Sequence, residues 1–347
     1  MQLSPSTVKM LKRFRSIRRG YYSCLLFFAL LGLSMCAELL INSRALVVKY
    51  EGKLFFPTYS AMIPGRTFDL DYDYETNYRD LARKFKDEHS NHFVLLPIIP
   101  YNPFENDLRE GFSPPEAPSW ERKHFLGTDA SGRDILARLV YGFRISIAFS
   151  LILLLINYII GIAIGSAMGY FGGWFDLLFQ RLIEIWSHLP FLYVIMIIAS
   201  VVKPSLFSLV GIMVFFGWMG MTWQMRTATY KEKEREYISA AKALGASSFR
   251  VIFTHILPNT VSMIITFVPF SISSGIVTLS MLDYLGFGLP APTPSWGELL
   301  RQGTANLNAH WISFSVVTAM VVVLTMVTFI GEAVREAFDP RKFSTYE

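Results

Sequence analysis

The side-chain patterns that support most enzyme chemistry are missing from this sequence. It contains no Gly-x-x-x-x-Gly-Lys-Ser/Thr loop to hold nucleotide phosphates, and neither His-Glu-x-x-His nor Gly-x-Ser-x-Gly occurs. His89 and His92 lack the cysteine or carboxylate pattern that accompanies a metal site, so they indicate a solvated surface. We therefore expect a chain that is not an enzyme, that binds no metal and that takes its energy from another protein.

One carboxylate stands apart from its apolar surroundings. Asp283 ends a long uncharged segment and is followed by the glycine- and proline-rich stretch LGFGLPAPTPSWGELL. A charged group near the end of a membrane span usually meets a partner or a watery route rather than lipid. Two interpretations of Asp283 stay open, a pathway or gate residue and a packing contact. An intramembrane hydrolase is disfavoured because no paired catalytic group accompanies it.

The stretch EYISAAKALGASSFRVIFTHILPN, residues 236–259, is helix-prone although it lies between two apolar segments. Helical spacing predicts one face formed by Tyr237, Ala240, Ala241 and Leu244. Gly245 is expected to end this helix, and a second helical run over Ser247–Ile256 leads back to the membrane at Pro258. The face fits either a cleft on another protein or the bilayer surface, and docking is favoured.

Small residues recur on a further predicted helix. Glycine occurs every four residues at Gly161, Gly165, Gly169 and Gly173. Such G-x-x-x-G steps lie on one helix face and allow a second helix to approach closely. Helix packing is favoured over a pore lining, because glycine offers a substrate little besides its backbone.

The elements that must position these residues are transmembrane helices. Hydrophobic residues make up 52% of the chain and charged residues 17%, against about 25% charged in soluble proteins. Six apolar segments reach the length of about 20 residues that a spanning helix needs. They are Tyr21–Ile41, Ile145–Phe171, Leu182–Val202, Pro204–Met225, Ile256–Leu282 and Trp311–Ile330. The predicted fold class is an all-α integral membrane protein with six transmembrane helices.

The basic residues predict the orientation. The first 20 residues contain six lysines and arginines and no acidic residue, which places the N-terminus in the cytoplasm. Six crossings also place the C-terminus inside. The resulting regions are a cytoplasmic N-terminus 1–20, a first helix 21–41, an extracytoplasmic insert 42–123, a core 124–335 with cytoplasmic loop 226–258, and a tail 336–347. The insert is expected to be ordered, with a helix over Asp80–His89 and acidic residues that are solvated.

Three stretches resemble one family of transport proteins. Ser239–Pro258 is similar to the cytoplasmic signature of ABC importer permeases, E-A-A, three residues, G, nine residues, I-x-L-P. Ala240, Ala241, Gly245, Leu257 and Pro258 match it, whereas Ser239 replaces the glutamate and His255 the isoleucine. FLGTDASGRDILARLVYGFRIS (residues 125–146) and PTPSWGELL (residues 292–300) resemble the C-type permeases of dipeptide and oligopeptide importers. The insert, together with LDYLGFGLP (residues 282–290) and GELLRQGTANLNAHW (residues 297–311), resembles the Yej-type branch, which imports microcin C and oligopeptides.

The resemblance implies a permease subunit in the inner membrane of a bacterium. It implies partnership with a second permease, with ABC ATPase subunits that hold the ATP and Mg, and with a periplasmic peptide-binding protein. This chain itself would bind no cofactor and no nucleic acid. Coupling to the ATPase would fall to Tyr237, Ala240, Ala241, Lys242, Leu244, Gly245, Leu257 and Pro258.

Two alternatives stay open at this point. An ion-driven secondary transporter would need charges deep within several spans or inverted repeats, and the second, fourth and sixth segments carry no charge. A membrane-anchored receptor or assembly protein would act through the insert.

Overall fold

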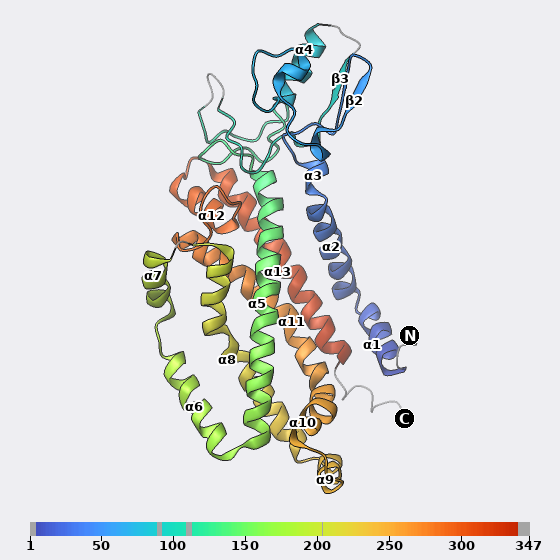
Figure 1. Ribbon diagram of the computed structural model, residues 1–347, viewed down its shortest axis with the longest axis vertical. Helices are drawn as coiled ribbons and strands as arrows, with labels where there is room; N and C mark the ends of the chain where they lie inside the picture. The colour runs from blue at the N-terminus through green and yellow to red at the C-terminus, as the bar shows by residue number, and fades with distance from the viewer. Residues whose placement is uncertain (1–4, 89–91, 109–112, 203, 339–347) are drawn as a thin grey trace.

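The computed structural model describes residues 5–88, 92–108, 113–202 and 204–338. It is an elongated bundle of helices with a small mixed lobe at one end (Figure 1). Four segments of the described chain are long and apolar enough to cross a membrane: α5 (Ile135–Phe171), α8 (Leu206–Lys233), the helix Ser248–Leu285, and α13 (His310–Phe338). A mostly helical membrane protein is thereby confirmed, while the number of six spans and their orientation stay predictions.

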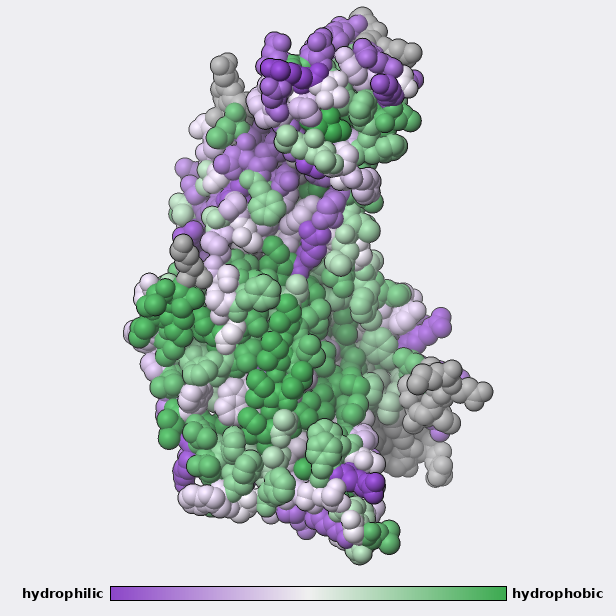
Figure 2. Space-filling model, in the orientation of Figure 1, coloured by the Kyte–Doolittle hydropathy of each residue, from purple (hydrophilic) through white to green (hydrophobic). Residues whose placement is uncertain are grey.

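Hydropathy follows this architecture. On the face shown in Figure 2, hydrophobic residues form a band over the helical bundle. Hydrophilic residues gather over the mixed lobe and at the opposite end of the bundle (Figure 2). Such a band is what a bilayer requires of the helices that it surrounds.

The first predicted span corresponds to α2 (Arg18–Met35) and the single turn α3 (Ala37–Leu40). Because α2 begins with two arginines, its apolar part is shorter than the apolar parts of the four long helices. α2 and the preceding α1 (Pro5–Ser16) pack against α13. The contact is close at Gly20, where any side chain would overlap Ala333.

The third predicted span is wrong as a single straight helix. Residues 182–202 belong to α6 (Gly173–Ser187) and α7 (Phe191–Val201), whose axes differ by 75°. The break comprises residues 188–190. Proline cannot donate a backbone hydrogen bond, and its ring disfavours helical geometry at the preceding residue, here Leu189. Together α6 and α7 form a bent arm beside α8 (Figure 1), a fifth candidate span.

The description all-α is also wrong, because the insert contains a sheet. β1 (Val47–Tyr50) pairs antiparallel with both β2 (Lys53–Phe55) and β3 (Phe93–Leu95). Glu51 and Gly52 form the two-residue β1–β2 turn with φ of 47° and 78°, which suits the twist of a tight hairpin. Strands of three and four residues are too short to show an alternating pattern in the sequence.

A separate hydrophobic core stabilises this lobe. It is formed by Ala45, Val48, Phe68, Tyr78, Leu81 and Phe85. Short helices η1 (Pro57–Tyr59) and η2 (Gly65–Phe68) lie in the same region as α4 (Tyr78–Asp87). α4 covers most of the predicted helix over residues 80–89, of which residue 89 lies outside the described chain. Asn77 caps α4 by accepting hydrogen bonds from the backbone N–H groups of residues 79 and 80.

The long helices share two larger cores. One lies among α2, α5, α11 (Leu257–Leu285), α12 (Trp296–Ala305) and α13, and the other lies among α5, α7, α8 and α11. α5 and α11 take part in both, so they are the central elements of the bundle (Figure 1). At the end opposite the insert, α9 (Glu236–Ala243), α10 (Ser248–Arg250) and the π-helix η3 (Val251–Ile256) connect α8 to α11.

Candidate functional site

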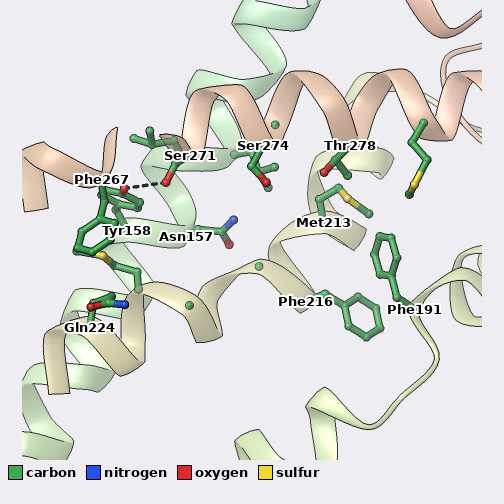
Figure 3. Close-up of a pocket in the computed structure, with 17 residues that line it drawn as sticks. Asn157, Tyr158, Phe191, Met213, Phe216, Gln224, Phe267, Ser271, Ser274 and Thr278 are labelled. Atoms are coloured by element: carbon green, nitrogen blue, oxygen red, sulfur yellow. Dashed lines mark hydrogen bonds between the residues drawn. The ribbon is translucent and has the colours of Figure 1, made fainter. Parts of the chain in front are cut away.

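A cavity of about 470 Å³ lies among α5, α7, α8 and α11 (Figure 3). None of the side chains that line it carries a charge. Its polar groups are neutral hydrogen-bonding side chains from three helices: Asn157, Tyr158, Gln224, Ser271, Ser274 and Thr278. Apolar side chains and glycines complete the wall. The cavity is therefore suited to a ligand that has neutral polar groups beside apolar ones.

Asn157 is the most unusual residue of this cavity. Its side chain is only 8% exposed, yet its Oδ1 atom has no hydrogen-bond partner among the described residues. Figure 3 shows the amide extending into the cavity from α5. On the facing helix, a side chain at Gly217 would overlap this amide, so the glycine makes room for it. A buried amide oxygen without a partner costs about 1–3 kcal/mol, so Asn157 is a strong candidate for a ligand contact.

The two ends of the cavity are lined differently. At one end, Tyr158 of α5 and Ser271 of α11 share a hydrogen bond of 2.8 Å between their hydroxyl groups (Figure 3). At the other end, the rings of Phe191 and Phe216 meet edge to face at 5.4 Å. Phe191 is the first residue of α7, directly after the break in the bent arm. The bent arm therefore contributes to the cavity wall and positions one of its aromatic residues.

Three of the four predicted packing glycines lie against α8. A Cβ atom added to Gly161, Gly165 or Gly169 would lie within 3 Å of the Cβ of Met221, Met225 or Thr229, respectively. None of the three lines the cavity. They bring α5 and α8 together and so fix the separation of Asn157 and Gln224 across the cavity.

Gly173 does not belong to this face, so the prediction that it packs with the other three glycines is wrong. α5 ends at Phe171, Gly172 and Gly173 have φ of 63° and 53°, and a Cβ added to either would meet no described atom within 4 Å. These two glycines allow the chain to turn from α5 into α6 in a left-handed conformation.

Asp283 is buried at the end of α11 and does not line the cavity. Its carboxylate accepts hydrogen bonds from the backbone N–H of Leu289 at 2.7 Å and from the hydroxyl of Ser295 at 2.5 Å. Glycines at 288 and 297 allow the chain to pass close to it. This geometry is that of a packing contact that holds the loop between α11 and α12, rather than that of a gate.

A buried ionic cluster near the start of α5 was not anticipated from the sequence. Arg138 is fully buried and donates a hydrogen bond to Glu298 of α12 at 2.5 Å. Arg133 donates to the same carboxylate at 3.1 Å and to Asp129 at 2.8 Å. Asp129 also lies 3.4 Å from Arg138. Charges that are paired in this way stabilise a specific arrangement, here the junction of α5 with α12.

His124 lies in a second buried polar group beside this cluster. Its ring nitrogens contact Asp134 at 2.8 Å and Asp107 at 3.3 Å, and its ring stacks on Tyr101 at 3.9 Å. Burial lowers the pKa of His124, but the hydrogen bonds and charges of Asp107 and Asp134 outweigh it, so the pKa is raised above its ordinary value. The two carboxylates stand 17 and 10 residues away in sequence, so no local pattern showed the group.

At the opposite end of the bundle, α9 is attached by Ile238, which lies outside the predicted docking face. Ile238 is fully buried in a core with Tyr170, Met225, Val251, Ile252 and Ile256. α9 ends before Gly245, whose φ is 82°. Ala240 and Ala241 belong to this helix, and Ala240 is exposed.

Some of the predicted docking residues expose their side chains, whereas Tyr237 is held by hydrogen bonds within the chain. Leu244 is 89% exposed, and Lys242 is also exposed with its ammonium 4.9 Å from the ring of Tyr170. Tyr237, although partly exposed, donates a hydrogen bond to Glu232 at 2.6 Å and accepts one from Asn259 at 2.9 Å. The segment between α9 and α11 also exposes Phe249 and Phe253, whose rings lie 4.2 Å apart. We call the exposed side chains Leu244, Phe249 and Phe253 the apolar end patch.

The predicted helical run over Ser247–Ile256 and the predicted span Ile256–Leu282 form one helix in the structure. It runs continuously from Ser248 to Leu285, through the π-helix and past Leu257 and Pro258. Pro258 follows the π-helix closely, so the helix already departs from regular α-helical hydrogen bonding near the point where the proline lacks an N–H. Phe249 and Phe253 of the apolar end patch therefore lie on the same continuous helix as the cavity-lining residues of α11.

Comparison with known proteins identifies the family. Residues 161–344 match the family described as "Binding-protein-dependent transport system inner membrane component". The chain belongs to this family. It is thus an inner-membrane permease of a binding-protein-dependent ABC transporter, as predicted, and not an ion-driven transporter or a receptor.

Relatives match over most of the chain. It is 41% identical to the inner membrane ABC transporter permease protein YejE of Escherichia coli (strain K12), over 98% of this chain and 99% of the relative. It is 38% identical to the peptidoglycan transport system permease protein YejE of Agrobacterium fabrum, over 98% and 94%. The oligopeptide transport system permease protein OppC of Escherichia coli (strain K12) is 34% identical, over 72% and 82%.

Proposed function

We propose that this permease carries short peptides, either oligopeptides or peptide–nucleotide antibiotics of the microcin C type. The observation that supports this cargo best is the uncharged cavity with the unpartnered amide of Asn157. A peptide backbone supplies N–H donors and C=O acceptors at every residue, and neutral side chains can satisfy both. A cavity without charges also places no demand on the charge of the cargo.

The names of the relatives agree with this class of cargo. One is a peptidoglycan permease and another an oligopeptide permease. Both kinds of cargo contain amide bonds, which is the feature that the cavity is equipped to bind.

ATP-driven motion would enter through the apolar end patch. An exposed leucine and two exposed aromatic rings form a surface that a partner protein can cover. We assign this partner as the ABC ATPase, which would hold the ATP and Mg, so that this chain binds neither. Ile238 anchors α9 in the bundle, so a displacement of the patch would reach α8 and α11 directly. Coupling requires that the ATPase bind the two states of the permease with different affinity.

The proposed assembly includes a second permease, which would complete the passage, and a periplasmic binding protein that delivers the cargo on the side of the insert. In this arrangement the N- and C-termini face the cytoplasm.

The cargo is tested with the assembled transporter in proteoliposomes, with the binding protein outside and ATP inside. We expect ATP-dependent accumulation of a radiolabelled tripeptide and none of a free sugar. The proposal is contradicted if the tripeptide does not accumulate, or if an ion gradient drives its uptake without ATP.

The docking surface is tested with Leu244→Glu. A charge in the centre of an apolar contact should weaken ATPase binding by at least about tenfold while the permease still folds. Leu307→Glu is the matched control, because Leu307 is as exposed but lies between α12 and α13, near the insert. Equal ATPase binding by the two variants would exclude the apolar end patch as the docking site.

A further inference from the structure

The insert contains a second cavity, with a character opposite to that of the first. It has a volume of about 670 Å³ and lies between α4 and the segments 96–101 and 121–123. Five cationic side chains line it, against one carboxylate at Glu121: Arg79, Arg83, Lys86, Arg122 and Lys123. The five come from two segments that are more than 30 residues apart, so they are brought together by the fold and not by a run of basic sequence.

Arg79 forms the buried side of this cavity. It is 8% exposed, and its guanidinium is fixed by Glu105, by the carbonyl of Pro100 at 2.6 Å, and by the ring of Tyr101 at 4.6 Å. Its Nε atom is buried and has no hydrogen-bond partner within the described part of the chain. A cation that is buried and held in place by three partners is a built feature rather than a solvated surface charge.

Two arginines at the rim of the cavity form only exposed or partly exposed ion pairs. Arg83 lies 3.4 Å from Asp80, and both side chains are more than half exposed. Arg122 pairs with Glu116, also partly exposed. Exposed ion pairs contribute about 0–1 kcal/mol, so an incoming oxyanion can compete with them for the guanidinium groups.

The rest of the wall is apolar. Ala82, Leu96 and Pro100 line the cavity beside the cations. The volume falls within the range of about 300–1,000 Å³ that small-molecule sites occupy. A flat surface for a protein partner would not need such a depression.

From this combination we propose that the cavity is a binding site for a small molecule that carries a carboxylate on an apolar body. The carboxylate would lie between Arg83 on α4 and Lys123 on the facing segment, and the apolar body would cover Leu96 and Pro100. Guanidinium and ammonium groups bind carboxylates through charge-assisted hydrogen bonds. The proposal does not depend on the cargo of the membrane cavity.

Such a ligand would join two parts of the molecule. α4 belongs to the core of the insert, whereas residues 121–123 lead directly to His124 and from there to the start of α5. Occupancy would therefore fix the insert against the membrane bundle.

The site is tested on the full-length protein in lipid nanodiscs by fluorescence anisotropy. The probes are the tripeptide Ala-Leu-Ala, labelled at its amino end, and the same tripeptide with a C-terminal amide. We expect the acid to bind about tenfold more tightly than the amide, the difference that one charge-assisted hydrogen bond provides. The double substitution Arg83→Gln, Lys123→Gln should abolish this preference, whereas Lys53→Gln, on the exposed hairpin, should retain it.

Competition with inorganic phosphate distinguishes the contribution of the charge from that of the apolar body. Phosphate has the charge without the apolar body, so it should displace the tripeptide acid only at far higher concentration than unlabelled acid does. Three results would overturn the proposal: equal binding of acid and amide, an unchanged preference in the double variant, or phosphate that competes as well as the tripeptide. If the double variant instead weakened only the association with the binding protein, the cavity would serve a protein partner and the proposal would be wrong.

Discussion

The cavity among α5, α8 and α11 and the ionic cluster at the start of α5 place polar groups on the same helix in opposite ways. In the ionic cluster the buried charges of Asp129, Arg138 and Glu298 are paired with one another. In the cavity the polar side chains are neutral, and Asn157 Oδ1 has no partner among the described residues. The difference separates structure from transport, since paired charges hold helices together, whereas neutral groups that line a cavity can bind and release a ligand.

The largest expected effect comes from breaking the ionic cluster. Glu298→Ala removes the closer of the two acidic partners of the fully buried Arg138 and should destabilise the protein by about 3–5 kcal/mol, because Arg133 and Arg138 are then left buried with only Asp129. Thermal unfolding in detergent measures this loss.

Arg144→Gln is the matched control for that substitution. Arg144 also lies on α5, and its partly exposed pair with Glu38 of α3 should contribute only about 0–1 kcal/mol. If the two variants unfold at the same temperature, the cluster is not what holds α5 to α12.

A smaller loss of stability is expected where α5 packs closely against α8 beside the cavity. Gly165→Ala places a methyl group within 3 Å of the Cβ of Met225, so α5 and α8 must separate, at a cost of about 1–3 kcal/mol. Gly211→Ala, on α8 with no described atom within 4 Å of the added methyl group, should instead stabilise by up to about 1 kcal/mol. Melting temperatures that shift in the same direction would refute close packing at Gly165.

The smallest effect is the pH dependence from His124. Its folded-state pKa is raised above the ordinary value of 6.5, so the protonated ring stabilises the fold. This contribution is fully present below pH 6.5 and is lost as the pH rises through the folded-state pKa. The difference in melting temperature between the native protein and His124→Gln should therefore shrink as the pH is raised from 6. A difference that stays constant or grows over that range would contradict the assignment.

The sequence predicted the elements whose signals are local. Long apolar runs located the helices, glycines at a four-residue spacing indicated the face of α5 that meets α8, and a glycine at 245 predicted the end of α9. The family prediction is confirmed by the comparisons. Each of these features depends on residues that are neighbours in the chain.

The features that escaped prediction depend on distant residues or on very short elements. Arg133 and Glu298 are separated by 165 positions, so no spacing relates them. Asn157 was inconspicuous within an apolar helix until α8 and α11 enclosed it. The strands of the insert are three or four residues long, and the bend at Pro190 falls within an otherwise continuous apolar segment.

The central claim is that a neutral cavity passes peptides while partner subunits supply the energy, and Asn157→Leu tests it most directly. Leucine has a similar size and removes the unpartnered amide, so the protein should fold as before. In proteoliposomes of the assembled transporter, tripeptide uptake should fall by about tenfold or more, as expected when a buried hydrogen bond to the cargo is lost. ATP hydrolysis stimulated by the binding protein should continue in the same vesicles. Tripeptide uptake at the native rate by Asn157→Leu would contradict the account.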